Sequence, residues 1–122
     1  MIIIDDIVFN VPVIAIRRRA DFLDKFAERT ADGKLQRELI GVYKNYQLQL
    51  GSSVDPEEYQ NLWRKLTEPV EFHEVTVPDF GGQSYTFTAY FSNVGDELRK
   101  AKGNITAWRD LTVNFIARVP AV

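Results

Sequence analysis

Apolar and polar residues alternate along three stretches of this 122-residue chain. The stretches run from Ile40 to Leu50, from Tyr85 to Phe91 and from Leu111 to Ala117. A period of two residues is typical of a β-strand that buries one face. A further β-compatible run, Val70–Val77, ends at Pro78. The pattern therefore predicts strands over all four segments.

The N-terminal third of the chain predicts more strands, connected by turns. Residues 1–9 are interpreted as two short strands around a turn at Asp5-Asp6, and Val13–Arg19 as another strand. In residues 21–39 the apolar residues have partly helical spacing, but Ala31-Asp32-Gly33 is a strong turn signal. We interpret this segment as a long hairpin with its polar tip at the Asp-Gly pair.

One segment has the pattern of an amphipathic helix. Asp55-Pro56-Glu57-Glu58 supplies a capping residue, a proline at the first helical position and acidic groups near the positive end of the helix dipole. The apolar residues that follow at helical spacing are Tyr59, Leu62, Trp63 and Leu66. Because Pro69 prevents continuation, the sequence predicts a helix from Pro56 to Leu66.

The order of elements predicts an α+β fold in a single domain, residues 1–122. Strands precede and follow one helix, whereas a parallel α/β fold needs alternating helices. The polar segment Gly95–Asn104 is predicted as a connection with a helical turn at Asp96–Lys100. We expect an antiparallel β-sandwich or small barrel, with the helix over about residues 56–66 flanking one opening.

Composition and charge exclude several classes of protein. The chain has no cysteine, so it forms no disulfide and no thiolate zinc site, and its single histidine, His73, cannot make a histidine-rich metal site by itself. The net charge of −2 argues against nucleic-acid binding. No apolar run has the length of a membrane-spanning helix, and no basic region precedes the first apolar residues. We therefore expect an intracellular chain without a membrane partner.

The candidate catalytic groups all have simpler structural interpretations. Asp5-Asp6, Glu57-Glu58 and Asp79 suit a turn, a helix start and a hairpin, whereas acid–base chemistry needs two carboxylates held together in a cleft. His73 has no second histidine to join it. Gly81-Gly82 is not followed by the lysine and helix of a phosphate loop. We predict no enzyme, and no catalytic, cofactor-binding or metal-binding residue.

The predicted strands carry more apolar surface than one core needs. Residues on the faces opposite the core are Tyr43, Gln47, Tyr90, Trp108 and Ile116. Such residues beside long strand edges favour a subunit whose sheet is covered by other copies, and a sandwich that covers both faces within the monomer is the alternative. We interpret the run Arg17-Arg18-Arg19 as a solvated or interface-paired strand end, and contact with a phosphate group is the alternative.

Four parts of the sequence together resemble a known group of proteins. They are ADFLDKFAERT (residues 20–30) with Asp32-Gly33, RELIGVYKNY (37–46), the helix end (58–69), and residues 85–93 with WRDLTVNF (108–115). These segments look like small proteins encoded in the tail regions of prophages and tailed phages of Gram-positive gut bacteria. The order of elements is also similar to that of the tail-tube and distal-tail family.

The resemblance implies a subunit that assembles with itself and with other tail proteins. Members of the family form a hexameric ring or tube from a β-sandwich with a flanking helix, and a long hairpin, here Asp24–Arg37, reaches a neighbouring subunit or the lumen. The implied location is the virion tail, assembled in the bacterial host cytoplasm. The predicted subunit interface comprises Arg17, Arg18, Arg19, Phe26, Glu28, Arg29, Asp32 and Lys34.

The sequence leaves open the position of such a subunit in the tail, and it allows two other functions. The chain is shorter than most tube proteins, so a tube, distal-tail, terminator or connector position is compatible with it. A second hypothesis is a small monomeric module that binds a peptide or carbohydrate through exposed Tyr43, Tyr90 and Trp108. A third is a hydrolase whose carboxylate pair includes Asp79 or Glu74.

Overall fold

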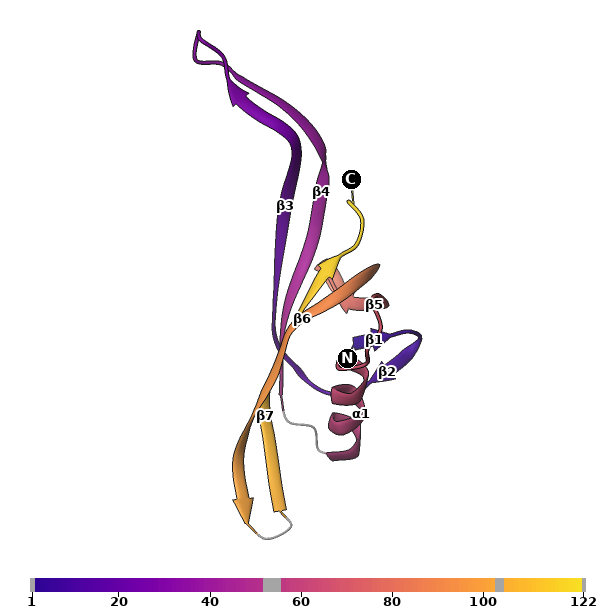
Figure 1. Cartoon of the computed structure of the whole chain (residues 1–122). Helices are drawn as coiled ribbons and strands as arrows, with labels where there is room; N and C mark the ends of the chain where they lie inside the picture. The colour runs from indigo at the N-terminus through magenta and orange to yellow at the C-terminus, as the bar shows by residue number, and fades with distance from the viewer. Residues whose placement is uncertain (1, 52–55, 103–104, 122) are drawn as a thin grey trace.

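The protein is built on one antiparallel sheet with a single helix beside it (Figure 1). The structure, a computed structural model, describes residues 2–51, 56–102 and 105–121, with side chains for these residues except 99–107 and 109. The elements in chain order are β1 (Ile2–Ile4), β2 (Ile7–Phe9), β3 (Val13–Arg29), β4 (Leu35–Leu50), α1 (Pro56–Leu66), β5 (His73–Pro78), the 3₁₀ turn η1 (Phe80–Gly82), β6 (Ser84–Lys102) and β7 (Ile105–Ala117).

The seven strands lie in the order β2-β1-β5-β6-β7-β4-β3, and every pairing is antiparallel. This confirms the expected antiparallel sheet with one flanking helix. In the part of the chain that the structure describes, the sheet is open, with β2 and β3 as its edges. Neither of the two finer forms, the sandwich or the small barrel, is therefore confirmed.

The core lies between one face of the sheet and α1. Leu48 on β4, Phe115 on β7 and Leu62 on α1 are fully buried there. The Tyr46 ring meets the rings of Tyr85 and Phe87 edge-on, with centroids 5.9 and 5.5 Å apart, and this geometry is favourable for aromatic pairs. The sheet therefore curves so that β4 and β6 share one core although β7 lies between them.

The helix has the predicted bounds, Pro56–Leu66. The expected apolar face packs onto the sheet, with Tyr59, Leu62 and Leu66 buried and Trp63 partly buried. The Glu58 carboxylate also accepts a hydrogen bond of 2.9 Å from the backbone N–H of Asn10. Asp55, the predicted capping residue, lies outside the described residues.

Two hairpins extend beyond the shared core, toward opposite ends of the molecule (Figure 1). Pairing of β3 with β4 continues to Arg29 and Leu35, whereas pairing of β4 with β7 covers only Tyr46–Leu50. We call the outer part of this hairpin, residues 19–45, the β3–β4 arm. At the other end β6 and β7 remain paired as far as Lys102 and Ile105. The predicted long hairpin over residues 21–39 is thus confirmed.

Three sequence predictions need correction. The helical turn at Asp96–Lys100 is wrong, because β6 continues as a strand through this segment and pairs with β7. The sequence of this segment is polar and lacks the alternation of a half-buried strand, so it resembles a loop. The strand predicted to begin at Val70 begins at His73. Ile40, predicted on a half-buried strand, is 53% exposed because it lies on the arm.

Candidate functional site

The β3–β4 arm carries a concentration of exposed apolar side chains. Between 45% and 59% of the surface of each is exposed, and the residues are Phe22, Leu23, Phe26, Leu35, Leu39 and Ile40. Successive residues of a strand point to opposite faces. Because Phe22 and Leu23 are adjacent on a regularly paired part of β3, apolar groups lie on both faces of the arm. A monomer leaves all of them in water.

The tip of the arm holds the charged residues predicted to lie at a subunit interface. Arg29 donates a hydrogen bond of 2.9 Å to the carbonyl of Gly33, which has a φ of 85°. The Asp32 carboxylate accepts hydrogen bonds from the Thr30 hydroxyl and from the Lys34 N–H. The hydrogen bond from Thr30 lowers the pKa of Asp32. These contacts give the tip a defined turn, on which Glu28 is also exposed.

The remaining predicted interface residues follow β3 at the base of the arm. Arg18 forms an ion pair of 3.0 Å with Asp79 and so connects β3 to the β5–β6 turn. Arg19 forms an ion pair of 2.9 Å with Asp21. Arg17 makes no ion pair with a described side chain. The structure thus places the predicted residues along one edge strand and its tip, over the whole length of the arm.

A buried asparagine that the sequence did not single out fixes the point where the arm leaves the body. Asn45 is 8% exposed and lies just beyond the last β4–β7 pair. Its side-chain oxygen accepts a hydrogen bond of 2.8 Å from the N–H of Ala117, and its amide donates one of 2.5 Å to Asp21. This hydrogen bond lowers the pKa of Asp21, with Arg19 contributing next. Asn45 therefore joins β3, β4 and β7 in a fixed geometry.

Of the three aromatic residues of the alternative hypothesis, Tyr43 is only partly exposed, and Tyr90 and Trp108 do not share one surface. Tyr90 on β6 is opposite Ile116 on β7, whereas Trp108 is opposite Leu98 on the other arm. Eight residues of β7 separate Trp108 from Ile116, about 26 Å at the usual rise of a strand. A ligand that contacts Tyr90 therefore does not reach Trp108 unless it spans most of the molecule.

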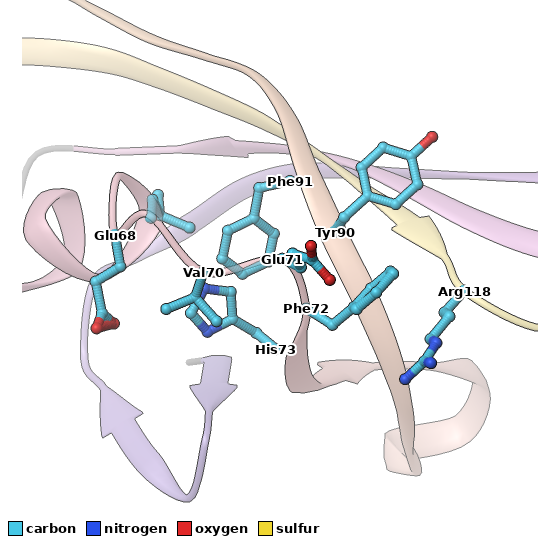
Figure 2. A pocket seen from close by; sticks show the side chains of 9 residues that line it. Glu68, Val70, Glu71, Phe72, His73, Tyr90, Phe91 and Arg118 are labelled. Carbon is cyan, nitrogen blue, oxygen red and sulfur yellow. The ribbon is translucent and has the colours of Figure 1, made fainter.

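A pocket opens beside β5, between the end of α1 and the end of β7 (Figure 2). Its lining includes Phe72, whose ring lies 4.4 Å from the Arg118 guanidinium, in addition to Glu68 and Tyr90. His73 is 3% exposed on the pocket wall and stacks on Phe91, with ring centroids 4.7 Å apart. The interpretation of His73 as an ordinary strand residue missed this environment.

His73 belongs to a polar network that the sequence does not reveal. Its Nδ1 atom lies 2.6 Å from Asp5, and the Lys65 ammonium lies 3.2 Å from Asp5 and 2.9 Å from Glu68. Partial burial acts to raise the pKa of Asp5, but hydrogen bonds from His73, the Glu74 N–H and Lys65 outweigh it and lower the pKa to about 2. The Glu68 carboxylate contributes most to raising the pKa of Lys65.

This network makes a prediction about stability at low pH. Because folding lowers the pKa of Asp5 from 3.8 to about 2, its ionised form stabilises the fold above pH 4, and this contribution is lost as the pH falls toward 2. We expect the urea midpoint of Asp5→Asn to fall less than that of the wild type between pH 4 and pH 2. Asp6→Asn, at the exposed neighbouring turn position, should keep the wild-type pH profile; equal profiles for all three chains would contradict the prediction.

Three of the carboxylates considered for catalysis, Asp5, Asp6 and Asp79, lie in a turn or an ion pair. Asp5 and Asp6 form the β1–β2 turn, with positive φ at both residues as hairpin turns of two residues require. Asp79, directly after β5, forms its ion pair with Arg18 on β3. Asp96 accepts a hydrogen bond of 2.9 Å from the Tyr59 hydroxyl and so joins α1 to β6.

Two searches of the chain gave negative results. Within the described residues, every helix is too short or too polar to cross a membrane. Comparisons with protein-family models, with curated proteins and with solved structures find no match. The functional argument therefore rests on the geometry of this chain and on the resemblance in its sequence.

Proposed function

We propose that this protein is a tail structural protein of a phage or prophage that assembles with itself into a ring or tube and performs no catalysis. The observation that carries the proposal is the β3–β4 arm, which exposes apolar side chains on both faces and presents β3 as an unpaired sheet edge. A flanking helix and a long projecting hairpin are also the features that the resemblance implies. The β-sandwich form belongs to this proposal.

The surface area of the monomer supports assembly. The chain exposes 8364 Å². A compact protein of this mass exposes about 6,700 Å². The excess of about 1,700 Å² is close to what a subunit covers when it makes two standard interfaces of about 800 Å² each. In a closed ring every subunit makes two such contacts, because one patch meets a different patch on the next copy.

The strength of the contacts predicts how assembly depends on concentration. Burying the exposed halves of the apolar arm side chains contributes about 1 kcal/mol for each residue. Association costs about 4–15 kcal/mol in lost freedom, so the arm alone does not hold two copies together firmly. Backbone hydrogen bonds along the β3 edge and closure of the ring add the rest. We therefore expect cooperative assembly with a concentration threshold.

The test is the native mass of the purified chain by light scattering over a concentration series, with negative-stain images at the highest concentration. We expect a change from monomer to one species of defined higher mass, seen as rings or tubes. A chain that stays monomeric at every concentration, also when mixed with preformed tail tubes from a phage that encodes a close homologue, would contradict the proposal. That outcome would instead favour the monomeric binding module.

A further inference from the structure

A second site, separate from the arm, lies where the β1–β2 turn, the segment after α1 and β5 meet. One carboxylate oxygen of Asp5, one of Glu68 and one ring nitrogen of His73 all lie within 4.8 Å of one another. The three residues come from separate segments of the chain, so the fold brings them together. Carboxylate oxygen and imidazole nitrogen are the ligands that zinc takes in proteins that lack cysteine.

The imidazole of His73 is held in one orientation and has one nitrogen without a partner. Stacking on Phe91 fixes the ring plane, and the Nδ1 atom lies 2.6 Å from the Asp5 carboxylate, which can only accept. In the neutral imidazole the proton is therefore on Nδ1, and Nε2 carries the lone pair that a metal ion can use. Among the described residues Nε2 is buried and has no hydrogen-bond partner. Figure 2 shows the ring nitrogens on the side of His73 that faces Glu68.

This arrangement has the chemistry of a metal-binding histidine. Histidines that bind metal commonly donate their other ring N–H to a carboxylate, which fixes the tautomer and strengthens the ligand nitrogen. Asp5 is itself held in place, because its second oxygen accepts a hydrogen bond of 2.9 Å from the N–H of Glu74. An unpaired lone pair in a buried position costs free energy unless a ligand occupies it.

A positive charge already lies within the cluster. The ammonium of Lys65 contacts both carboxylates, at 3.2 Å from Asp5 and 2.9 Å from Glu68. It reaches them from α1 on a flexible stem, and Lys65 also lines the neighbouring groove between α1 and β2. The ammonium is not a hydrogen-bond partner of His73 Nε2 and has room to move into that groove. Lys65 is therefore a competitor for a cation at this place and is not one of its ligands.

We propose that this cluster binds a divalent cation of the zinc class, with His73 Nε2 and the Glu68 carboxylate as ligands and Asp5 as the group that orients His73. Water completes the coordination, as in zinc sites that have fewer than four protein ligands. The imidazole ligand favours zinc or a similar transition metal over Mg²⁺ and Ca²⁺, which prefer oxygen. Binding would join the N-terminal hairpin, the segment after α1 and β5. The site does not depend on assembly of the arm.

The single histidine allows a direct test. Because His73 is the only histidine, a long-range ¹H–¹⁵N spectrum of the untagged chain contains one imidazole. We expect the tautomer protonated at Nδ1 without metal and a shift of the Nε2 resonance when ZnCl₂ is added. Calorimetric titration with ZnCl₂ should give one ion per chain, and CoCl₂ should develop visible absorption.

Four variants separate binding at this cluster from binding elsewhere. His73→Gln should abolish zinc binding, and Asp5→Asn should weaken it about 10- to 100-fold, as loss of an orienting carboxylate does elsewhere. Lys65→Met should raise the zinc affinity about fivefold, because a partly exposed ion pair of the ammonium no longer competes with the metal ion. Glu74→Gln, whose side chain is exposed on the opposite face of β5, is the matched acidic control and should bind like the wild type.

The Lys65→Met variant keeps the test decisive if His73→Gln fails to fold, because it leaves all proposed ligands in place. Absence of zinc binding in both the wild type and Lys65→Met would overturn the proposal. Equal zinc affinity for these two chains, or a folded His73→Gln chain that binds as the wild type does, would overturn it as well. An imidazole that is protonated at Nε2 and whose resonances do not shift with zinc would also overturn the proposal.

Discussion

A chain with a shortened β3–β4 arm is expected to remain a folded monomer at concentrations where the wild type assembles. In this variant Asn-Gly replaces residues 28–36, so that the paired residues Ala27 and Arg37 flank a turn of two residues. Asn-Gly is the preferred sequence for such a turn, and the removed segment makes no contact with the core. The change removes Glu28, Arg29, Asp32 and Lys34, the charged part of the predicted interface. Light scattering measures whether the variant is monomeric, and far-ultraviolet circular dichroism measures whether it is folded.

The shortened arm distinguishes an interface from an accessory loop. Glu74→Gln, which changes an exposed charge on β5, separated from β4 by β6 and β7 in the sheet, serves as the control and should assemble normally. Loss of assembly together with an unchanged urea midpoint would place the junction at the tip. A shortened chain that forms particles of wild-type mass would show that the tip lies outside the interface, and the proposal that the arm drives assembly would then be abandoned.

The fold was predictable where one local rule determines the backbone. The helix could be located because Pro56 and the first-turn acids mark its start and apolar spacing marks its buried face. The long hairpin could be located because Gly33 adopts a positive φ at its tip. The second arm, formed by β6 and β7, was not predictable, because its sequence is polar and three register shifts interrupt the pairing of its strands. Periodicity is informative only where a core imposes it.

The cluster around His73 and the hydrogen bonds of Asn45 could not be predicted from the sequence, for a different reason. Asp5 and His73 are separated by 68 residues, so no spacing rule connects them, and a turn aspartate and a strand histidine each have an ordinary interpretation alone. Asn45 was equally inconspicuous, because its partner Ala117 contributes only a backbone N–H. The alternation assigns Asn45 to the solvent-facing positions of the strand, so the pattern gave no sign of its buried hydrogen bond. The predicted interface residues stay a prediction, and all of them lie on β3 or in the turn that follows it.

The second large effect concerns stability. Phe115→Ala is expected to lower the free energy of unfolding by about 3–5 kcal/mol, the usual range when a buried phenylalanine is truncated. Phe115 is fully buried on β7, pairs with Tyr46 and lies 4.8 Å from the ring of Phe91. Its truncation leaves a cavity where three strands pack against one another. Urea unfolding followed by tryptophan fluorescence, at a concentration below the assembly threshold, measures the change.

The matched control is the same type of substitution, phenylalanine to alanine, at a position on the arm. Phe22 is 59% exposed and has one cation–π contact, with Arg37 at 5.3 Å. Such a contact contributes about 0.5–1 kcal/mol, so Phe22→Ala should change the free energy of unfolding by less than about 1 kcal/mol while raising the concentration needed for assembly. If instead both variants lose the same stability, the arm would belong to the core of the monomer. Its apolar side chains would then be no evidence for a neighbouring subunit.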